Sequence, residues 1–329
     1  MRRKLLLTIQ SILEFLGAAV GTLLSFSPHT GSRIYGTLIA WNREQHDRIT
    51  LLMHPFLTSL GKSIFDLRMP LLRRIKIQTG GLMELDLAEK TQRQIFSHKL
   101  FEAGVSRFVK ATLHVGDVFV DVGANVGYFS VLAAPLVGTQ GKVIAIEPEK
   151  KNFERLSYHA QLNGYSQIAL YNCAVGDEEG MQTLHINPLN HGGNSLIPFR
   201  AYASGNERHS ANEIRSQYSN EELFEEVQVR ILDRIFEEQN ISEIVILKID
   251  VEGFEKPVIH GAVKAITSGM VEHVICEVNN DEGRSELFDL FTSRSYKAYR
   301  ISFSGVPEPI NSSVVRGNVL FSRYDRTTE

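Results

Sequence analysis

Hydrophobic residues follow two different spacings between residues 118 and 322. Short runs rich in Val, Ile and Leu, some of them interrupted by polar residues, indicate strands, and the most apolar of these runs indicate strands that are covered on both faces. Between these runs, apolar residues recur every three or four positions, as they do on the buried face of a helix. The predicted strands are, in chain order, 118–122, 142–147, 168–174, 182–186, 227–232, 244–250, 271–278, 296–301 and 318–322. The predicted helices are 127–137, 148–163, 233–239, 255–267 and 286–293. Strands that alternate with helices predict an α/β domain with a doubly wound, mostly parallel sheet. The last strand follows a Pro-containing loop instead of a helix, so it can run antiparallel.

Shorter elements are predicted between residues 82 and 114, before the first central strand. A strand is predicted at 82–87, a helix at 92–100, and an amphipathic helix that ends at His114. We therefore expect the main domain to cover residues 76–329. Within it, residues 187–222 are polar and have no hydrophobic period, which favours a loop or cap on the substrate side.

Residues 1–75 form a basic, apolar extension that is predicted to be helical. Its first 26 residues begin with Met-Arg-Arg-Lys and continue with an apolar stripe that Gln10 and Glu14 interrupt. These polar residues argue against a signal peptide. In a transmembrane helix, Glu14 near the middle would cost about 2.5–3.5 kcal/mol. Two interpretations of residues 1–26 remain: a helix on a membrane surface, or a helix packed on this protein or on a second copy of it.

Composition and charge narrow the class of protein. Hydrophobic residues make up 43% of the 329 residues and charged residues 22%, which are values typical of a globular protein. The two cysteines, Cys173 and Cys276, lie in apolar runs, so a disulfide framework is not expected and a cytoplasmic location is the natural expectation. Residues 1–75 contain ten basic and four acidic residues, whereas the remainder contains 25 basic and 34 acidic ones. The acidic main body argues against nucleic acid as a partner.

The stretch from Val118 to Ser130 carries the most specific chemistry. It reads as a buried strand, a turn bracketed by Gly123 and Gly127, and the start of a helix. Asp121 lies two residues before the first glycine, where its charge would repel the pyrophosphate of a dinucleotide. A ligand with a positive centre and no phosphate, such as S-adenosylmethionine (SAM), suits this acid better. The simpler interpretation is an ordinary turn beside a solvated carboxylate.

Glu147 adds to the interpretation of this turn. It ends the second central strand, where a carboxylate can accept hydrogen bonds from both ribose hydroxyls of adenosine. It could equally be an acid that the dipole of the following helix favours. The combination of Asp121, the glycine turn and Glu147 is a more specific indication of SAM binding than any of these features alone.

The apolar strand 244–250 ends in candidate catalytic residues. Lys248 lies within it and needs an acidic partner if it is buried, for which Asp250, Asp121 and Glu277 are candidates. It forms either a structural ion pair or the support of a catalytic carboxylate. Asp250 and Glu252 lie where a base for a hydroxyl acceptor is expected. With Glu277 and Asn279, Asp250 could also form a magnesium site, but we favour an interpretation without metal.

Three motifs resemble the FkbM-type family of class I SAM-dependent methyltransferases. They are residues 116–127, 174–177, and 247–255 with His260-Gly-Ala262, and the likeness covers about residues 80–322. The resemblance implies a Rossmann-like, seven-stranded sheet and O-methylation of a sugar, glycolipid or polyketide-like product. It also implies that Ala174 lies near the adenine and Asp250 near the transferred methyl group. By the same pattern, the residues that would hold SAM are Asp121, Gly123, Asn125, Gly127 and Glu147.

The prediction is thus a SAM-dependent O-methyltransferase with a small-molecule or glycolipid acceptor. The rivals are a nicotinamide-dependent oxidoreductase, which Asp121 and the missing middle glycine disfavour, and a catalytically silent SAM-binding or scaffold protein. Residues 1–26 would provide peripheral membrane contact or self-association.

Overall fold

The computed structural model describes residues 72–87, 89–187, 193–197, 223–278, 284–310 and 317–324, with short pieces at 12–13, 15–21, 34–35 and 38. The chain divides into two compact units. One comprises Met1–Lys76 with Glu84–Phe101, and the other Ile77–Met83 with Glu102–Glu329. The second unit contains every residue to which the sequence assigns chemistry.

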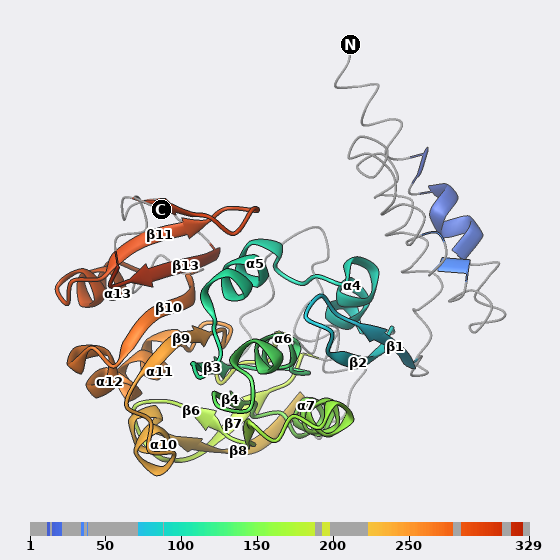
Figure 1. Ribbon diagram of the computed structural model, residues 1–329. Coiled ribbons are helices and arrows are strands. Elements are labelled where there is room, and N and C mark those ends of the chain that lie inside the picture. Colours follow the sequence, from blue (N-terminus) through green and yellow to red (C-terminus); the bar gives the residue numbers. More distant parts are fainter. Residues whose placement is uncertain are drawn as a thin grey trace. The chain divides into compact units, whose positions relative to one another are not determined.

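An eight-stranded sheet forms the centre of the second unit, in the order β12-β11-β13-β10-β9-β3-β4-β5 (Figure 1). Its strands are β3 (Val118–Val122), β4 (Lys142–Ile146), β5 (Ile168–Tyr171), β9 (Ile244–Ile249), β10 (Val271–Val278), β11 (Lys297–Ile301), β12 (Pro307–Pro309) and β13 (Gly317–Ser322). The strands from β5 to β10 are parallel, and β13 is antiparallel to both β10 and β11. The doubly wound α/β fold is therefore confirmed, with β12 as a short edge strand beyond the seven expected.

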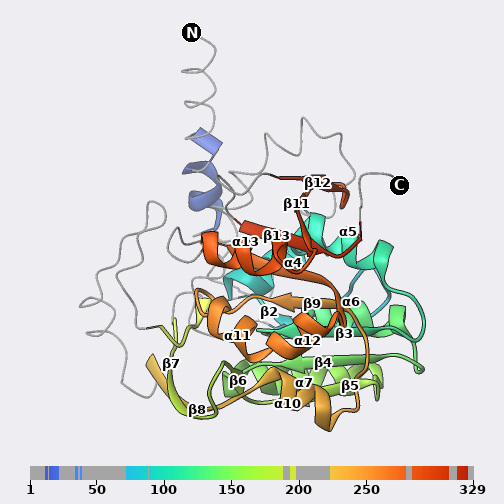
Figure 2. The ribbon, with the colours of Figure 1, turned by 90° about the vertical axis from the view of Figure 1, so that its left-hand side faces the viewer.

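A separate three-stranded sheet, in the order β6-β8-β7, corrects one predicted strand (Figure 2). Its members are β6 (Ala174–Val175), β7 (Gly180–His185) and β8 (Phe224–Arg230). The apolar run 168–174 was expected to be one strand, but β5 ends at Tyr171 and Ala174 pairs with Val229 in the small sheet. Between them, the Asn172 side chain donates hydrogen bonds to the carbonyls of Glu147 and Pro148, which holds the chain at the edge of the main sheet.

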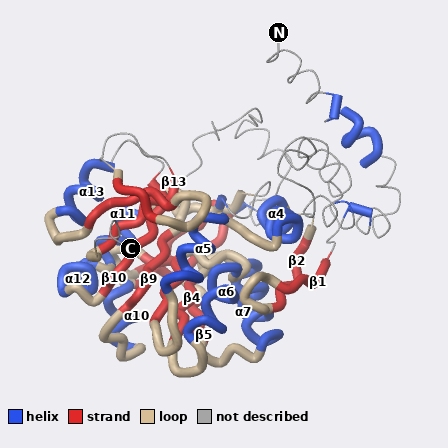
Figure 3. The backbone as a smooth tube through the Cα atoms, turned by 45° about the horizontal axis from the view of Figure 1, so that its top comes forward, coloured by secondary structure: helices blue, strands red, loops and turns tan. Residues whose placement is uncertain are grey.

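Helices cover both faces of the main sheet (Figure 3). On one face lie α5 (Ala103–Thr112), α6 (Tyr128–Val137) and α7 (Lys150–Asn163), and on the other α10 (Leu232–Glu238), α11 (Glu255–Gly261), α12 (Val263–Ser268) and α13 (Arg284–Thr292). The expected helix 255–267 is interrupted at Ala262. A Cβ on the adjacent Gly261 would lie 2.1 Å from the Gly176 carbonyl oxygen, so the backbones of α11 and the small sheet are in close contact.

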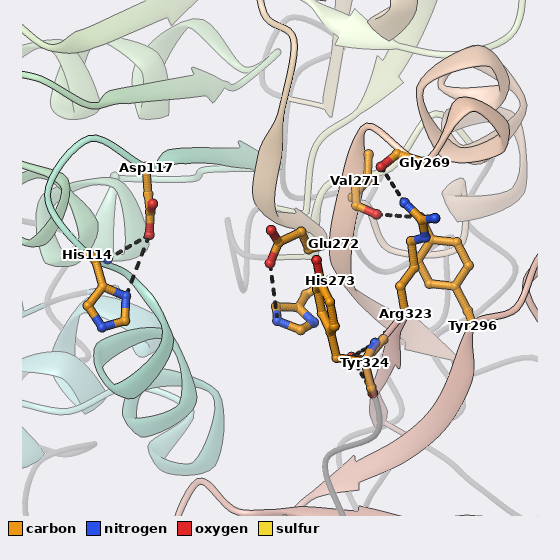
Figure 4. Close-up of polar contacts among 10 residues, drawn as sticks. His114, Asp117, Gly269, Val271, Glu272, His273, Tyr296, Arg323 and Tyr324 are labelled. Atoms are coloured by element: carbon orange, nitrogen blue, oxygen red, sulfur yellow. Dashed lines mark hydrogen bonds and ion pairs between the residues drawn. The ribbon is translucent and has the colours of Figure 1, made fainter. Parts of the chain in front are cut away.

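The amino ends of the strands are held by hydrogen bonds on the side opposite the predicted chemistry (Figure 4). Before β3, the carboxylate of Asp117 accepts the His114 N–H at 2.7 Å. Beside β10, the Tyr296 hydroxyl donates to the Val271 carbonyl at 2.6 Å, and Arg323 donates to the Gly269 carbonyl. These contacts hold the amino ends of β3 and β10 in place, and the candidate site lies at the opposite, carboxyl ends of the strands.

In the other unit, the structure describes β1 (Leu72–Lys76), the part of β2 (Leu82–Asp86) from Glu84 onwards, and α4 (Lys90–His98). The Tyr35 hydroxyl lies 3.0 Å from Ser97 Oγ. Most of the predicted extension 1–75, including most of residues 1–26, lies outside the described residues. Among the helices that the structure describes, none has the length and apolar character needed to cross a membrane.

Candidate active site at the carboxyl ends of the strands

The turn after β3 brings three strand ends together. The N–H groups of Gly123 and Ala124 both donate to the Ile146 carbonyl of β4 at 3.0 Å, and the Asp250 N–H donates to the Val122 carbonyl at 3.0 Å. Gly123 has a φ of +77°, and a Cβ there would lie 1.9 Å from the Asp250 carbonyl oxygen. Only glycine fits at this point, so the turn is held directly beside Asp250.

Gly127 and Asn125 complete the turn in left-handed conformations. Gly127 has a φ of +85°, and a Cβ there would lie 2.5 Å from Leu156 Cδ1 of α7. Asn125 has a φ of +52°, and its side-chain oxygen accepts the N–H of Val126 at 2.8 Å. Asn tolerates this region better than most residues, which explains its place between the two glycines.

Asp121 is a buried carboxylate with one unsatisfied oxygen. Its side chain is 1% exposed, and Oδ2 accepts a hydrogen bond from Ser130 Oγ at 2.6 Å. Oδ1 is buried and has no hydrogen-bond partner within the part of the chain that the structure describes. Burial raises the pKa of Asp121, while Lys248 and Ser130 oppose that rise. The interpretation of Asp121 as a solvated carboxylate beside an ordinary turn is therefore wrong.

Glu147 is also buried, directly after β4. Its carboxylate accepts the N–H of Asn125 at 2.8 Å and that of Glu149 at 3.0 Å, so it connects the glycine turn to the start of α7. Burial and the nearby Glu149 raise its pKa to about 8, although the backbone hydrogen bonds act in the opposite direction. The structure thus places Asp121, Gly123, Asn125, Gly127 and Glu147 around one turn.

Lys248 forms the ion pair that its burial demands. Its Nζ donates to Asp250 Oδ2 at 2.7 Å, and the two side chains are 2% and 23% exposed. The ammonium lies 4.7 Å from the centre of the Phe129 ring, and Lys248 is opposite Asp121 in the register of β3 and β9. Burial alone would lower the pKa of Lys248, but Asp250, Glu102 and Asp121 together raise it. The lysine therefore stays charged.

Glu102 is a member of this cluster that the sequence does not reveal. It precedes α5 with a φ of +42°, and its Oε1 accepts a hydrogen bond from Asn318 of β13 at 2.9 Å. Oε2 is buried and has no hydrogen-bond partner among the described residues. Burial raises the pKa of Glu102, and its charge interacts with Lys248, Asp250 and Asp121. A single acid that is remote in sequence from Lys248 gives no signal of this contact.

A second group of carboxylates lies on the outer side of Asp250. One oxygen each from Asp250, Glu252 and Glu277 all lie within 4.8 Å of one another. Glu252 is exposed on one side, but partial burial of its carboxylate and the charges of Asp250, Glu277, Glu255 and Glu102 raise its pKa to about 8. Glu255 differs from Glu252 because it accepts the Gly253 N–H at 2.9 Å, as expected for an acid at a helix start. Asn279, the other predicted magnesium ligand, lies outside the described residues.

Ala174 is placed apart from the turn residues. Its side chain is buried in the small sheet with Leu184, Val227 and Val229, so only its backbone could face a ligand. Of the predicted cap 187–222, the structure describes residues 193–197 and 187 itself. There, Asn194 donates to Glu149 at 2.8 Å and Ser195 Oγ donates to the Glu252 carbonyl at 2.8 Å. This short segment therefore connects the Glu147 side of the site to the Glu252 side.

Comparisons with known proteins identify a methyltransferase family. The sequence profile of the Methyltransferase FkbM domain matches residues 121–298. Methyltransferase 1 of Beauveria bassiana is 26% identical over 173 residues, which cover 50% of this chain and 65% of that protein. The chain thus spans just under two thirds of this curated relative.

Solved structures give weaker similarities. The methyltransferase FkbM from Methylobacillus flagellatus is 15% identical with a TM-score of 0.40, over 89% of this chain and 59% of that chain. A SAM-dependent O-methyltransferase from Thermotoga maritima is 10% identical with a TM-score of 0.36, over 78% of this chain and 87% of that one.

Proposed function

Because the chain belongs to the FkbM methyltransferase family, we propose that it transfers a methyl group from SAM to a hydroxyl oxygen of a carbohydrate, glycolipid or related natural-product acceptor. The observation that carries this proposal is the position of Asp250, held by Lys248 and in direct backbone contact with the Gly123 turn. Family membership argues against the nicotinamide-dependent alternative.

The residues around the turn fit SAM chemically. Asp121 has a buried carboxylate oxygen that lacks a hydrogen-bond partner among the described residues, and a cationic group could satisfy it. Glu147 offers a carboxylate beside the turn, whose oxygens can accept hydroxyl groups in addition to two backbone N–H groups. When bound, SAM would supply an electrophilic methyl group on a positively charged sulfur. The backbone of Gly123, Asn125, Gly127 and Ala174 would shape the cavity around it.

Asp250 and Glu252 are the residues that we assign to the acceptor side. A neutral hydroxyl is a poor nucleophile, and a carboxylate within hydrogen-bond reach can accept its proton as the new carbon–oxygen bond forms. Lys248 holds one oxygen of Asp250 and leaves the partly exposed carboxylate oriented outwards. Lys248 is therefore a positioning residue in this proposal, and Asp250 is the preferred base with Glu252 as the alternative.

Two measurements test the proposal. Calorimetry should show that SAM and S-adenosylhomocysteine bind, whereas NAD does not; the reverse result would restore the oxidoreductase hypothesis. Incubation with methyl-labelled SAM and a cell extract, followed by mass spectrometry, should place the label on an oxygen of an acceptor. SAM binding without label transfer would favour a catalytically silent protein, and label on nitrogen or carbon would exclude O-methylation.

For location, we propose a cytoplasmic protein with peripheral membrane contact or self-association through residues 1–26. Apolar side chains in the described part of this segment support an amphipathic helix, since Ile12, Phe15 and Leu16 are 52%, 73% and 46% exposed. The basic start of the chain favours an anionic surface.

A further inference from the structure

We propose that Asp250, Glu252 and Glu277 bind one divalent cation, such as Mg²⁺ or Mn²⁺, on the acceptor side of the site. The three residues come from the end of β9, the turn that follows it and the neighbouring strand β10. One carboxylate oxygen from each lies within 4.8 Å of the other two, a spacing that a single ion can bridge. Hard carboxylate ligands favour Mg²⁺ and Mn²⁺ over softer metals.

Glu102 provides an independent observation that points to a missing cation. Its Oε2 is buried without a hydrogen-bond partner within the described residues. Its Oε1 is bound by Asn318, and Asn318 lies directly opposite Glu277 in the register of β10 and β13. The charges of Glu102, Asp250 and Glu252 also influence one another, so this acid borders the group, and its unsatisfied oxygen could accept a hydrogen bond from a water molecule bound to the ion.

Carboxylates are the main charged groups around Glu252 among the described residues. Lys248 contributes one ammonium, which is hydrogen-bonded to Asp250 Oδ2. The charged groups with the largest influence on Glu252 are four other carboxylates: Asp250, Glu277, Glu255 and Glu102. Glu252 is exposed, which gives the ion a path from solvent.

The cation would give the acceptor side a second function. Mg²⁺ seldom loses all its waters, so three protein ligands leave positions for oxygen atoms of a substrate. This role rests on the proposed function. Adjacent hydroxyl groups of a sugar-like acceptor would bind at the open positions of the cation and be oriented toward Asp250. The substrate class most consistent with such a site is an acceptor with two neighbouring oxygens.

Binding of Mn²⁺ alone to the full-length protein tests the site without any acceptor. Electron paramagnetic resonance should show one Mn²⁺ bound per chain, and Mg²⁺ should displace it. Glu252→Gln and Glu277→Gln should each weaken Mn²⁺ binding by at least about tenfold. Glu179→Gln is the matched control, because Glu179 pairs with Arg234 on the small-sheet side and should leave binding unchanged.

Folding is checked separately by thermal unfolding. Without metal, the Glu252 variant should keep its Tm or gain stability because it removes charge repulsion. Mn²⁺ should raise the Tm of the wild type and of Glu179→Gln, but not that of the Glu252 variant. Absence of Mn²⁺ binding to the wild type, or equal binding by a folded Glu252→Gln, Glu277→Gln double variant, would overturn the metal site. Methyl transfer that persists in EDTA would then leave the proposed function intact. Mn²⁺ binding with no methyl transfer to any acceptor would instead remove the proposed function and leave the metal site.

Discussion

Lys248 and Asp250, two residues apart at the end of β9, form a 2.7 Å ion pair in which the ammonium is buried and the carboxylate is partly exposed. The pair connects the interior of the sheet to the edge where the glycine turn lies. Glu102 and Asp121 surround the same ammonium, so a single lysine stabilises three carboxylates. Several properties of the protein should depend on this arrangement.

Asp250→Asn should reduce kcat by about 10²–10⁴-fold if Asp250 is the base, because the amide keeps the shape and loses the ability to accept a proton. SAM affinity should change little, and calorimetry with S-adenosylhomocysteine provides that control. Full activity in a folded Asp250→Asn protein would show that Asp250 is not the base. Glu252 would then be the candidate base, and Glu252→Gln would test it.

Lys248→Met should destabilise the protein by about 3–5 kcal/mol, because it leaves buried carboxylates without their shared cation. Urea denaturation gives the free energy of unfolding. Adding Glu102→Gln should recover part of the loss, since one of the uncompensated charges is removed. If Lys248→Met is as stable as the wild type, the ammonium is not the partner that holds these acids.

Affinity for 5′-methylthioadenosine should rise as the pH increases through about 8. Glu147 has its pKa raised to about 8, so it is mostly protonated at pH 7 and mostly ionised at pH 9. The ionised carboxylate accepts ribose hydroxyls more strongly than the protonated one. This ligand lacks the amino group of SAM, whose own titration would confuse the result. The affinity of Glu147→Gln should be weak and independent of pH over this range, and a flat profile in the wild type would contradict the ribose assignment.

Gly123→Ala should be far more damaging than Gly164→Ala, although both glycines have positive φ. At Gly123 the new Cβ would collide with the Asp250 carbonyl oxygen, whereas at Gly164 no heavy atom lies within 4 Å. The Gly164 variant should lose only the conformational cost of about 1–2 kcal/mol. Equal losses of Tm in the two variants would show that the turn moves away from Asp250 easily.

Deletion of residues 1–26 separates the two interpretations of this segment. If it binds a membrane surface, the truncated protein should keep its Tm but stop sedimenting with anionic vesicles at low salt, since each basic residue contributes about 1 kcal/mol near such a surface. If it packs on protein, the truncation should lower the Tm or change the oligomeric state. Failure of the full-length protein to bind anionic vesicles would exclude the membrane interpretation.

The sequence by itself determined the central strands and the residues of the glycine turn. The predicted bounds of 118–122 and 271–278 match β3 and β10, because Val-rich, mostly apolar runs favour buried strands and a glycine or polar residue follows each run. The turn residues are close in sequence, and the rule that ligands bind at carboxyl ends brings Glu147 and Asp250 beside them.

Only the tertiary structure decided which distant groups share a site. Glu102 and Asn318 join this group through the packing of α5 and the position of β13 beside β10, and no local pattern encodes that order. The break of the apolar run at Asn172 and the placement of Ala174 in the small sheet likewise depend on partners far along the chain. Local hydrophobic periodicity fixes an element, whereas the charge environment of a buried side chain depends on neighbours that folding brings together.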